Sequence, residues 1–119
     1  MRLGEIDLEL IPRNFSFLSM QHHVYFWVKE ECKTTEGIES FEAGLQSLME
    51  IPSVVQGSFG TPAATEERGP VDNSWDYALI INFEDVKGHD EYQVHPIHDD
   101  FVAKFKDIWS QVRVSDVQF

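Results

Sequence analysis

The chain has 119 residues and a formal net charge of −12 at pH 7. This length suits one hydrophobic core rather than two, and nine Phe, three Trp and three Tyr are typical of a folded globular domain. The excess of acidic residues disfavours nucleic acid and anionic membrane surfaces as partners, because both would repel the chain.

Membrane insertion and secretion are also disfavoured by the sequence. No apolar run approaches the roughly 18–20 residues that a membrane-spanning helix needs. Glu5, Asp7 and Glu9 interrupt the region where a signal peptide would be hydrophobic. The single cysteine, Cys32, excludes an internal disulfide bond and is compatible with a reducing compartment. We therefore expect a cytoplasmic protein.

The start of the chain differs in pattern from the rest. Its apolar residues alternate with acidic ones, which predicts a short strand at Ile6, Leu8 and Leu10. The first strong strand pattern follows immediately after Ser19. The sequence thus predicts an N-terminal extension at residues 1–19 and one folded domain at residues 20–119.

Residues 21–29 have the period-2 pattern of a strand. Its two faces carry His23, Tyr25 and Trp27 on one side and Val24, Phe26 and Val28 on the other. Both sets are apolar or aromatic, which predicts a central strand covered on both faces. The neighbouring His22 and the distant His89 are expected to be exposed.

An amphipathic helix is predicted next. Thr34 or Thr35 is suited to cap its first turn, and Pro52 marks its exit. Apolar residues recur between them at helical spacing, and they are Ile38, Phe41, Leu45, Leu48, Met49 and Ile51.

The second half of the chain predicts two further strands, a helix and a last strand. Residues 54–59 form a weak strand pattern, a long polar segment occupies residues 60–76, and Tyr77–Phe83 is a clear strand. Residues 84–94 resemble a loop with a short helical turn. A second amphipathic helix begins at Asp99, and a final strand carries Val112 and Val114.

This order of elements predicts an α+β protein with a ferredoxin-like βαββαβ protomer and an antiparallel sheet. Helices would cover one face of that sheet, and the other face would present Tyr25 and Trp27 to water. A large exposed aromatic patch usually marks an interface. The simplest expectation is a homodimer in which two sheets pack face to face.

Residues 90–98 concentrate polar groups suited to chemistry. Tyr92, His95 and His98 lie within seven residues, and Pro96 biases His95 away from the helical region. His98 leads into the second amphipathic helix and so lies near a helix N-terminus. If this segment meets the strand at residues 21–29, the two would form a small polar site among aromatic side chains.

These features together resemble the stress-responsive dimeric α/β-barrel (Dabb) family over about residues 21–117. The matching positions are His23, residues 48–52, residues 76–79, Tyr92, the His95-Pro96-x-His98 motif, Phe101 and residues 114–116. The resemblance implies a ferredoxin-like protomer whose sheet pairs with a second copy to form a dimeric α/β barrel. Most members of the family have no assigned reaction.

One branch of the family, similar to olivetolic acid cyclase from plants, closes a linear polyketide by an intramolecular aldol step. The resemblance implies that His98 is the catalytic base, that Tyr92 is the proton donor, and that His23 lines the pocket. An imidazole suits the first role at neutral pH and a phenol suits the second. The remaining candidate pocket residues are Tyr25, Trp27 and His95, and the expected ligand is a small aromatic or polyketide-like molecule.

The resemblance favours a stress-responsive dimeric α/β-barrel protein of unassigned activity with a candidate small-molecule pocket, and the cyclase is one alternative to it. A cofactor-independent monooxygenase could use Trp27, Tyr25 and Trp75 to line an aromatic pocket, and a structural dimer in stress tolerance would use no pocket. The His95-x-x-His98 pair suggests a metal, but Pro96 breaks the helical spacing that would align the two imidazoles, and further convergent ligands are lacking. The sequence therefore predicts neither a metal site nor a cofactor.

Overall fold

The computed structural model describes residues 19–119 of the chain. The strand predicted at Ile6, Leu8 and Leu10 lies outside the described residues. The elements within them are β1 (Met20–Val28), α1 (Thr35–Ser47), β2 (Gln56–Gly60), β3 (Tyr77–Phe83), α2 (Val86–Gln93), α3 (Pro96–Phe105) and β4 (Trp109–Gln118), with short 3-10 helices at Glu30–Cys32, Leu48–Glu50 and Lys106–Ile108. None of the helices in this part of the chain has the length and apolar character needed to cross a bilayer.

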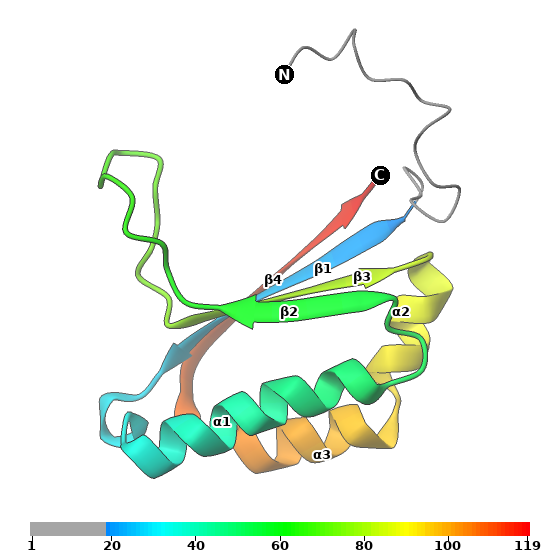
Figure 1. Cartoon of the computed structure of the whole chain (residues 1–119), viewed down its shortest axis with the longest axis horizontal. Helices are drawn as coiled ribbons and strands as arrows, with labels where there is room; N and C mark the ends of the chain where they lie inside the picture. The colour runs from blue at the N-terminus through cyan, green and yellow to red at the C-terminus, as the bar shows by residue number, and fades with distance from the viewer. Residues whose placement is uncertain (1–18) are drawn as a thin grey trace, which may run out of the picture.

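The strands form one antiparallel sheet in the order β2-β3-β1-β4. All three α-helices lie on one side of this sheet, and the long loop between β2 and β3 rises on the other side (Figure 1). This two-layer arrangement is the predicted ferredoxin-like α+β fold, and β1 is a central strand as the sequence indicates. We call the side of the sheet without helices the open face.

Burial alternates strictly along β1, and this alternation decides which histidine faces the core. Its even-numbered residues are buried under the helices, whereas the odd-numbered residues are partly exposed on the open face. His22 has the same parity as Val24 and Phe26 and is 3% exposed. The expectation that His22 is exposed is therefore wrong, because a strand sends every second side chain to the same face.

The core between the sheet and the helices is built mainly from aromatic rings. Phe41 of α1 is fully buried, and its ring centroid lies 5.2 Å from that of Phe26 and 5.3 Å from those of Tyr77 and Phe105. The hydroxyl of Thr34 accepts a hydrogen bond from the Gly37 amide and caps α1, as the sequence predicts.

Both helices that carry the Tyr92–His98 segment differ from the prediction. The segment predicted as a loop with a helical turn contains α2, an eight-residue helix whose N-cap Asp85 accepts a hydrogen bond from the Gly88 amide. Helix α3 begins at Pro96 rather than at Asp99. Proline is favourable at the first helical position, because the amide that it lacks has no partner there.

The end of the long loop packs onto the open face of the sheet. Trp27 donates its indole N–H to the hydroxyl of Ser74 at 3.0 Å, and the rings of Tyr25 and Trp75 lie 5.3 Å apart. One carboxylate oxygen of Asp76 accepts the Val28 amide at 2.7 Å. The end of the loop thus contacts the aromatic residues Tyr25 and Trp27 of the open face.

Candidate functional site

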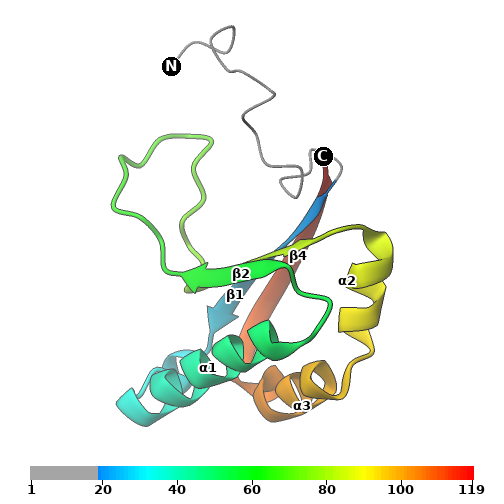
Figure 2. The same cartoon turned by 45° about the vertical axis from the view of Figure 1, so that its right-hand side comes forward.

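Four ring side chains meet at one end of the sheet, where α2 and α3 cover the start of β1. His22 comes from β1, His89 and Tyr92 from α2, and His98 from α3. The centroid of His22 lies 4.9 Å from that of His89 and 5.8 Å from that of Tyr92, and Tyr92 lies 4.9 Å from His98. Figure 2 shows how α2 and the start of α3 close this end of the molecule. We call this group the ring cluster.

His22 anchors the ring cluster to β4. Its Nδ1 lies 2.6 Å from a carboxylate oxygen of Asp116, its antiparallel neighbour across the sheet. Burial lowers the pKa of His22 and outweighs the Asp116 carboxylate, which acts in the opposite direction. The His22 imidazole is therefore neutral at pH 7.

Tyr92 lies at the centre of the ring cluster and is 1% exposed. Burial raises the pKa of its hydroxyl well above the ordinary value, so the phenol keeps its proton. That hydroxyl forms no hydrogen bond with any residue that the structure describes. A protonated phenol without a partner is available to donate a hydrogen bond to a bound molecule.

His98 also has a polar atom without a hydrogen-bond partner among the described residues. It is half-buried at the third position of α3, and its Nδ1 is fully buried without a hydrogen-bond partner among residues 19–119. Burial lowers the pKa of His98, and Asp99 opposes this only in part. The ring is thus a neutral imidazole, in contact with Tyr92 and able to accept a proton.

His95, the other histidine of the sequence motif, is engaged by the backbone. It is the N-cap residue of α3, and its Nδ1 accepts a hydrogen bond from the Ile97 amide at 3.1 Å. This cap satisfies one of the amides that a helix start leaves without a partner. The geometry gives His95 a structural task at the entrance of the helix that carries His98.

The structure does not bring His23 to Tyr92 and His98. His23 lies on the open face, where its Nε2 is 2.9 Å from the side-chain oxygen of Gln21. The interpretation of His23, Tyr92 and His98 as parts of one site is wrong, because residues 22 and 23 point to opposite faces of β1. His22 holds the place beside Tyr92 that the resemblance assigned to His23.

The other two predicted pocket residues, Tyr25 and Trp27, also lie on the open face. The guanidinium of Arg113 stacks over the Tyr25 ring at 4.8 Å, and Trp27 is bonded to the long loop. They are therefore separated from Tyr92 and His98 by the thickness of the sheet.

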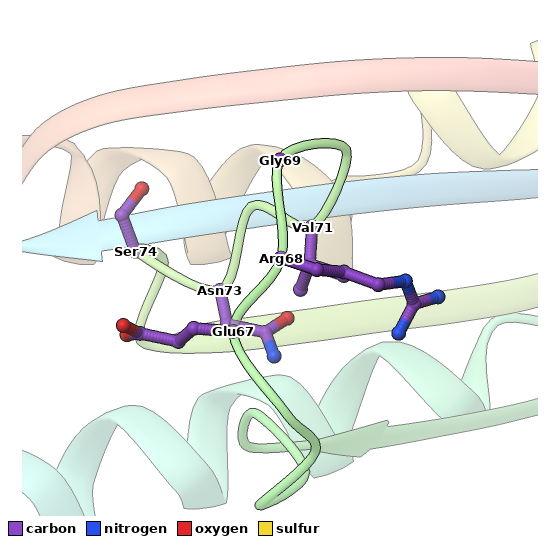
Figure 3. Close-up of a pocket in the computed structure, with 6 residues that line it drawn as sticks. All are labelled: Glu67, Arg68, Gly69, Val71, Asn73 and Ser74. Carbon is purple, nitrogen blue, oxygen red and sulfur yellow. The ribbon is translucent and has the colours of Figure 1, made fainter.

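Two open hollows lie elsewhere on the molecule. One, of about 500 Å³, is lined by the long loop itself, with Glu67, Arg68 and Asn73 among its residues (Figure 3). The other, of about 460 Å³, lies between α1 and α3 and is lined partly by Gly44 and Lys104. Neither contains a member of the ring cluster.

Three members of this region were not predicted from the sequence, and they are His22, His89 and Asp116. Counting back by two from Val24 along β1 places His22 on the core face, so the strand pattern already contained this signal. His89 precedes Tyr92 by three residues, which places both on one face once α2 is known to be a helix. Asp116 required the register of β1 with β4, which the sequence does not supply.

The burial of His98 predicts a pH-dependent contribution to stability. Its pKa is lowered on folding, so the folded state binds fewer protons than the unfolded state as the pH falls through the unfolded value of about 6.5. The stability contributed by neutral His98 is present above that pH and is lost below it. Urea unfolding of the wild type and of His98→Gln at pH 7.5, 6.5 and 5.5 measures this effect.

The difference in the free energy of unfolding between the wild type and His98→Gln isolates the contribution of His98, because the titration of the other acidic groups affects both proteins equally. We expect the wild type to lose stability relative to His98→Gln as the pH falls. A difference that is constant with pH, or that favours the wild type at low pH, contradicts a buried neutral imidazole.

Comparisons with known proteins agree with this architecture. The chain superposes on a crystal structure of a protein from Arabidopsis thaliana with a TM-score of 0.72 at 22% identity, covering 84% of this chain and 94% of that one. A hydroxynitrile lyase from Passiflora edulis gives a TM-score of 0.71 at 19% identity, with 85% and 93% covered. A dimeric ferredoxin-like protein of unknown function from Thermobifida fusca gives 0.69 at 19%, with 85% and 91% covered.

These identities are low, so the structural neighbours establish the fold alone. No curated protein shows a significant match to the chain in sequence. The sequence model of one protein family, the stress responsive A/B barrel domain, matches residues 20–119. This span contains every strand and helix described above, and it agrees with the resemblance read from the sequence motifs. The chain belongs to the stress-responsive A/B barrel (Dabb) family.

Proposed function

We propose that this protein is a homodimeric Dabb enzyme that binds a small aromatic or polyketide-like molecule against Tyr92 and His98 and uses them as an acid–base pair. His98 is the base, Tyr92 is the hydrogen-bond donor, and His22 holds the Tyr92 ring in place. Residues 1–19 form an extension outside this catalytic domain.

The observation that carries the proposal is the buried Nδ1 of His98, which has no partner among the described residues. Burying a polar atom without a hydrogen bond costs about 1–3 kcal/mol, and such atoms in folded proteins call for a bound water, an ion or a functional role. Ser53, Asn82 and Trp109 also carry such atoms, but His98 alone among the four packs against a buried tyrosine whose hydroxyl has no partner either.

The chemistry follows from the protonation states of the two rings. Neutral His98 removes a proton from a carbon made acidic by neighbouring carbonyl groups, which leaves an enolate. The enolate attacks a second carbonyl of the same molecule, so that a carbon–carbon bond forms and an alkoxide results. The Tyr92 hydroxyl donates a hydrogen bond to the developing negative charge, and the proton held by His98 neutralises the alkoxide.

The monooxygenase alternative has less support from the geometry. The aromatic residues that would line its pocket, Tyr25, Trp27 and Trp75, lie on the open face and are engaged with the long loop and with Arg113. The hydroxynitrile lyase among the structural neighbours indicates that this fold can carry an enzyme.

The proposed homodimer would form through the open face of the sheet. Ile80 and Val117 stand on this face and are 36% and 38% exposed, and Tyr25 and Trp27 lie beside them. The helices of the described chain all lie on the other side of the sheet (Figure 1). A second copy that presents the same face would cover them by two-fold symmetry, and the neighbour from Thermobifida fusca is described as dimeric.

Isothermal titration with 2,4-dihydroxybenzoate, a small aromatic acid, tests the ligand site. Tyr92→Phe removes the donor and leaves the ring packing, and His98→Gln removes the base and leaves a polar side chain. Each substitution is expected to weaken binding by about tenfold, the loss expected for one hydrogen bond to a bound ligand. His23→Gln, one residue from His22 but on the open face, is the matched control and is expected to bind as the wild type does.

Equal binding by the wild type, Tyr92→Phe and His98→Gln contradicts this site. Loss of binding in His23→Gln with retention in the other two would instead place the ligand on the open face. Oxygen consumption with an aromatic substrate would support the monooxygenase, since an aldol cyclisation consumes no oxygen.

A further inference from the structure

Two histidines and a carboxylate converge beside Tyr92 from three separate elements. His22 comes from β1, His89 from α2 and Asp116 from β4. One potential ligand atom of each lies within 4.8 Å of those of the other two. We propose that His22, His89 and Asp116 form a binding site for a divalent transition-metal ion of the zinc or cobalt class.

The residue types suit such an ion. Two imidazoles and one carboxylate are a ligand set found at metal sites that keep open coordination positions, including those of zinc and of non-haem iron. Three protein ligands leave room for a water or a substrate atom. The strongly acidic chain, with net charge −12, also favours accumulation of cations near its surface.

The distances require a modest adjustment of the His89 and Asp116 side chains. Ligand atoms around a tetrahedral ion with bonds of about 2.1 Å lie roughly 3.4 Å apart. His22 and Asp116 are now closer than this, at 2.6 Å, because they share a hydrogen bond, and no pair of the three ligand atoms is more than 4.8 Å apart. The Asp116 side chain is 45% exposed and that of His89 is 15% exposed, whereas that of His22 is 4% exposed, so Asp116 has the most room to adjust.

Neighbouring groups orient His89 for this role. Its Nδ1 lies 3.0 Å from a carboxylate oxygen of Asp90, and its Nε2 lies 3.5 Å from the amide nitrogen of Gln93. An amide nitrogen donates, so Nε2 is the acceptor and Nδ1 carries the proton that Asp90 accepts. A carboxylate behind a histidine N–H is the usual second-layer support of a metal ligand, because it fixes the tautomer. The ion would replace the long Gln93 contact at Nε2.

Metal binding would replace the hydrogen bond between His22 and Asp116. The neutral His22 ring would shift its proton from Nδ1 to Nε2, with no net loss of a proton, so that the Nδ1 lone pair and the Asp116 carboxylate both face the ion. No oxidation or reduction is involved. The ion would sit beside the Tyr92 ring, which His22 contacts, but its binding does not depend on the acid–base role proposed for Tyr92 and His98.

The spacing of the three residues explains why no sequence motif indicated the site. Positions 22, 89 and 116 are far apart in the chain and meet only through the register of β1 with β4 and the docking of α2. The one metal-like spacing in the sequence is His95-x-x-His98, and it does not form the site. His95 instead caps α3.

The test uses the full chain after dialysis against a chelator. Isothermal titration with Zn²⁺ and visible absorption during titration with Co²⁺ report affinity and coordination, and one ion per protomer is expected. His89→Ala and Asp116→Asn are each expected to weaken binding by about tenfold or more. His23→Ala, which removes a histidine of the same strand from the opposite face, is the matched control and is expected to bind as the wild type does.

A second measurement needs no variant. The side-chain nitrogen signals of His22 and His89 in the NMR spectrum of the wild type are expected to shift on addition of Zn²⁺, while that of His23 stays in place. Absence of saturable binding, unchanged affinity in His89→Ala, an equal loss in His23→Ala, or shifts confined to other histidines would each overturn the proposal. If His89→Ala does not fold, the NMR shifts of the wild type decide.

Discussion

Replacing Phe41 by alanine is expected to lower the free energy of unfolding by about 3–5 kcal/mol. The side chain is fully buried, and its ring contacts rings from β1, β3 and α3. Alanine leaves a cavity bordered by all of these elements, and rigid rings on several sides cannot collapse into it without losing their own contacts. Urea unfolding followed by circular dichroism measures the effect.

Phe119→Ala is the matched control, because it removes the same ring from an exposed position at the end of the chain. That side chain is 50% exposed, so a change of about 0.5 kcal/mol or less is expected. A similar loss of stability in the two variants would contradict a core centred on Phe41.

Ile80→Asp is expected to convert the proposed homodimer into monomers, with a rise of about a hundredfold or more in the dissociation constant. Ile80 stands in β3 on the open face, opposite His23 in the neighbouring strand. In the proposed dimer it lies where two sheets meet, and a carboxylate there would lose its hydration and face its symmetry mate. In the free monomer the position is 36% exposed, so the fold itself is expected to tolerate the change.

Val94→Asp provides the control for added negative charge, because Val94 is 75% exposed between α2 and α3 and not on the sheet. Sedimentation equilibrium of the three proteins measures the dissociation constant. Dimers of equal strength in the wild type and Ile80→Asp would show that the open face is not the interface. Monomeric wild-type protein over the whole concentration range would rule out the homodimer.

The sheet could be predicted from the sequence because its strands carry a clear pattern. Tyr77–Phe83 was predicted with the same bounds that β3 has, and the alternation in residues 21–29 identified β1 as central. Helix α2 was missed as a full helix because Tyr92 is its one buried residue, so it lacks an apolar stripe. Its N-terminal cap by Asp85 and the contact of Tyr92 with the sheet stabilise it instead.

The site was predicted only in part, for a reason that lies in strand geometry. Tyr92 and His98 were identified by local spacing, and the structure brings their rings together. The strand histidine was assigned to the wrong residue, and a shift of one position in a strand moves a side chain to the opposite face. Asp116 and His89 reach His22 through pairing and packing over long sequence distances, which no local pattern records.

A crystal structure with bound 2,4-dihydroxybenzoate tests the central claim most directly, because it locates the ligand without reference to activity. The account predicts density for the ligand beside α2 and α3, with one of its oxygens within hydrogen-bond distance of the Tyr92 hydroxyl and another near Nδ1 of His98. A ligand bound in the hollow of the long loop or on the open face, with a filled interior around Tyr92 and His98, would contradict it.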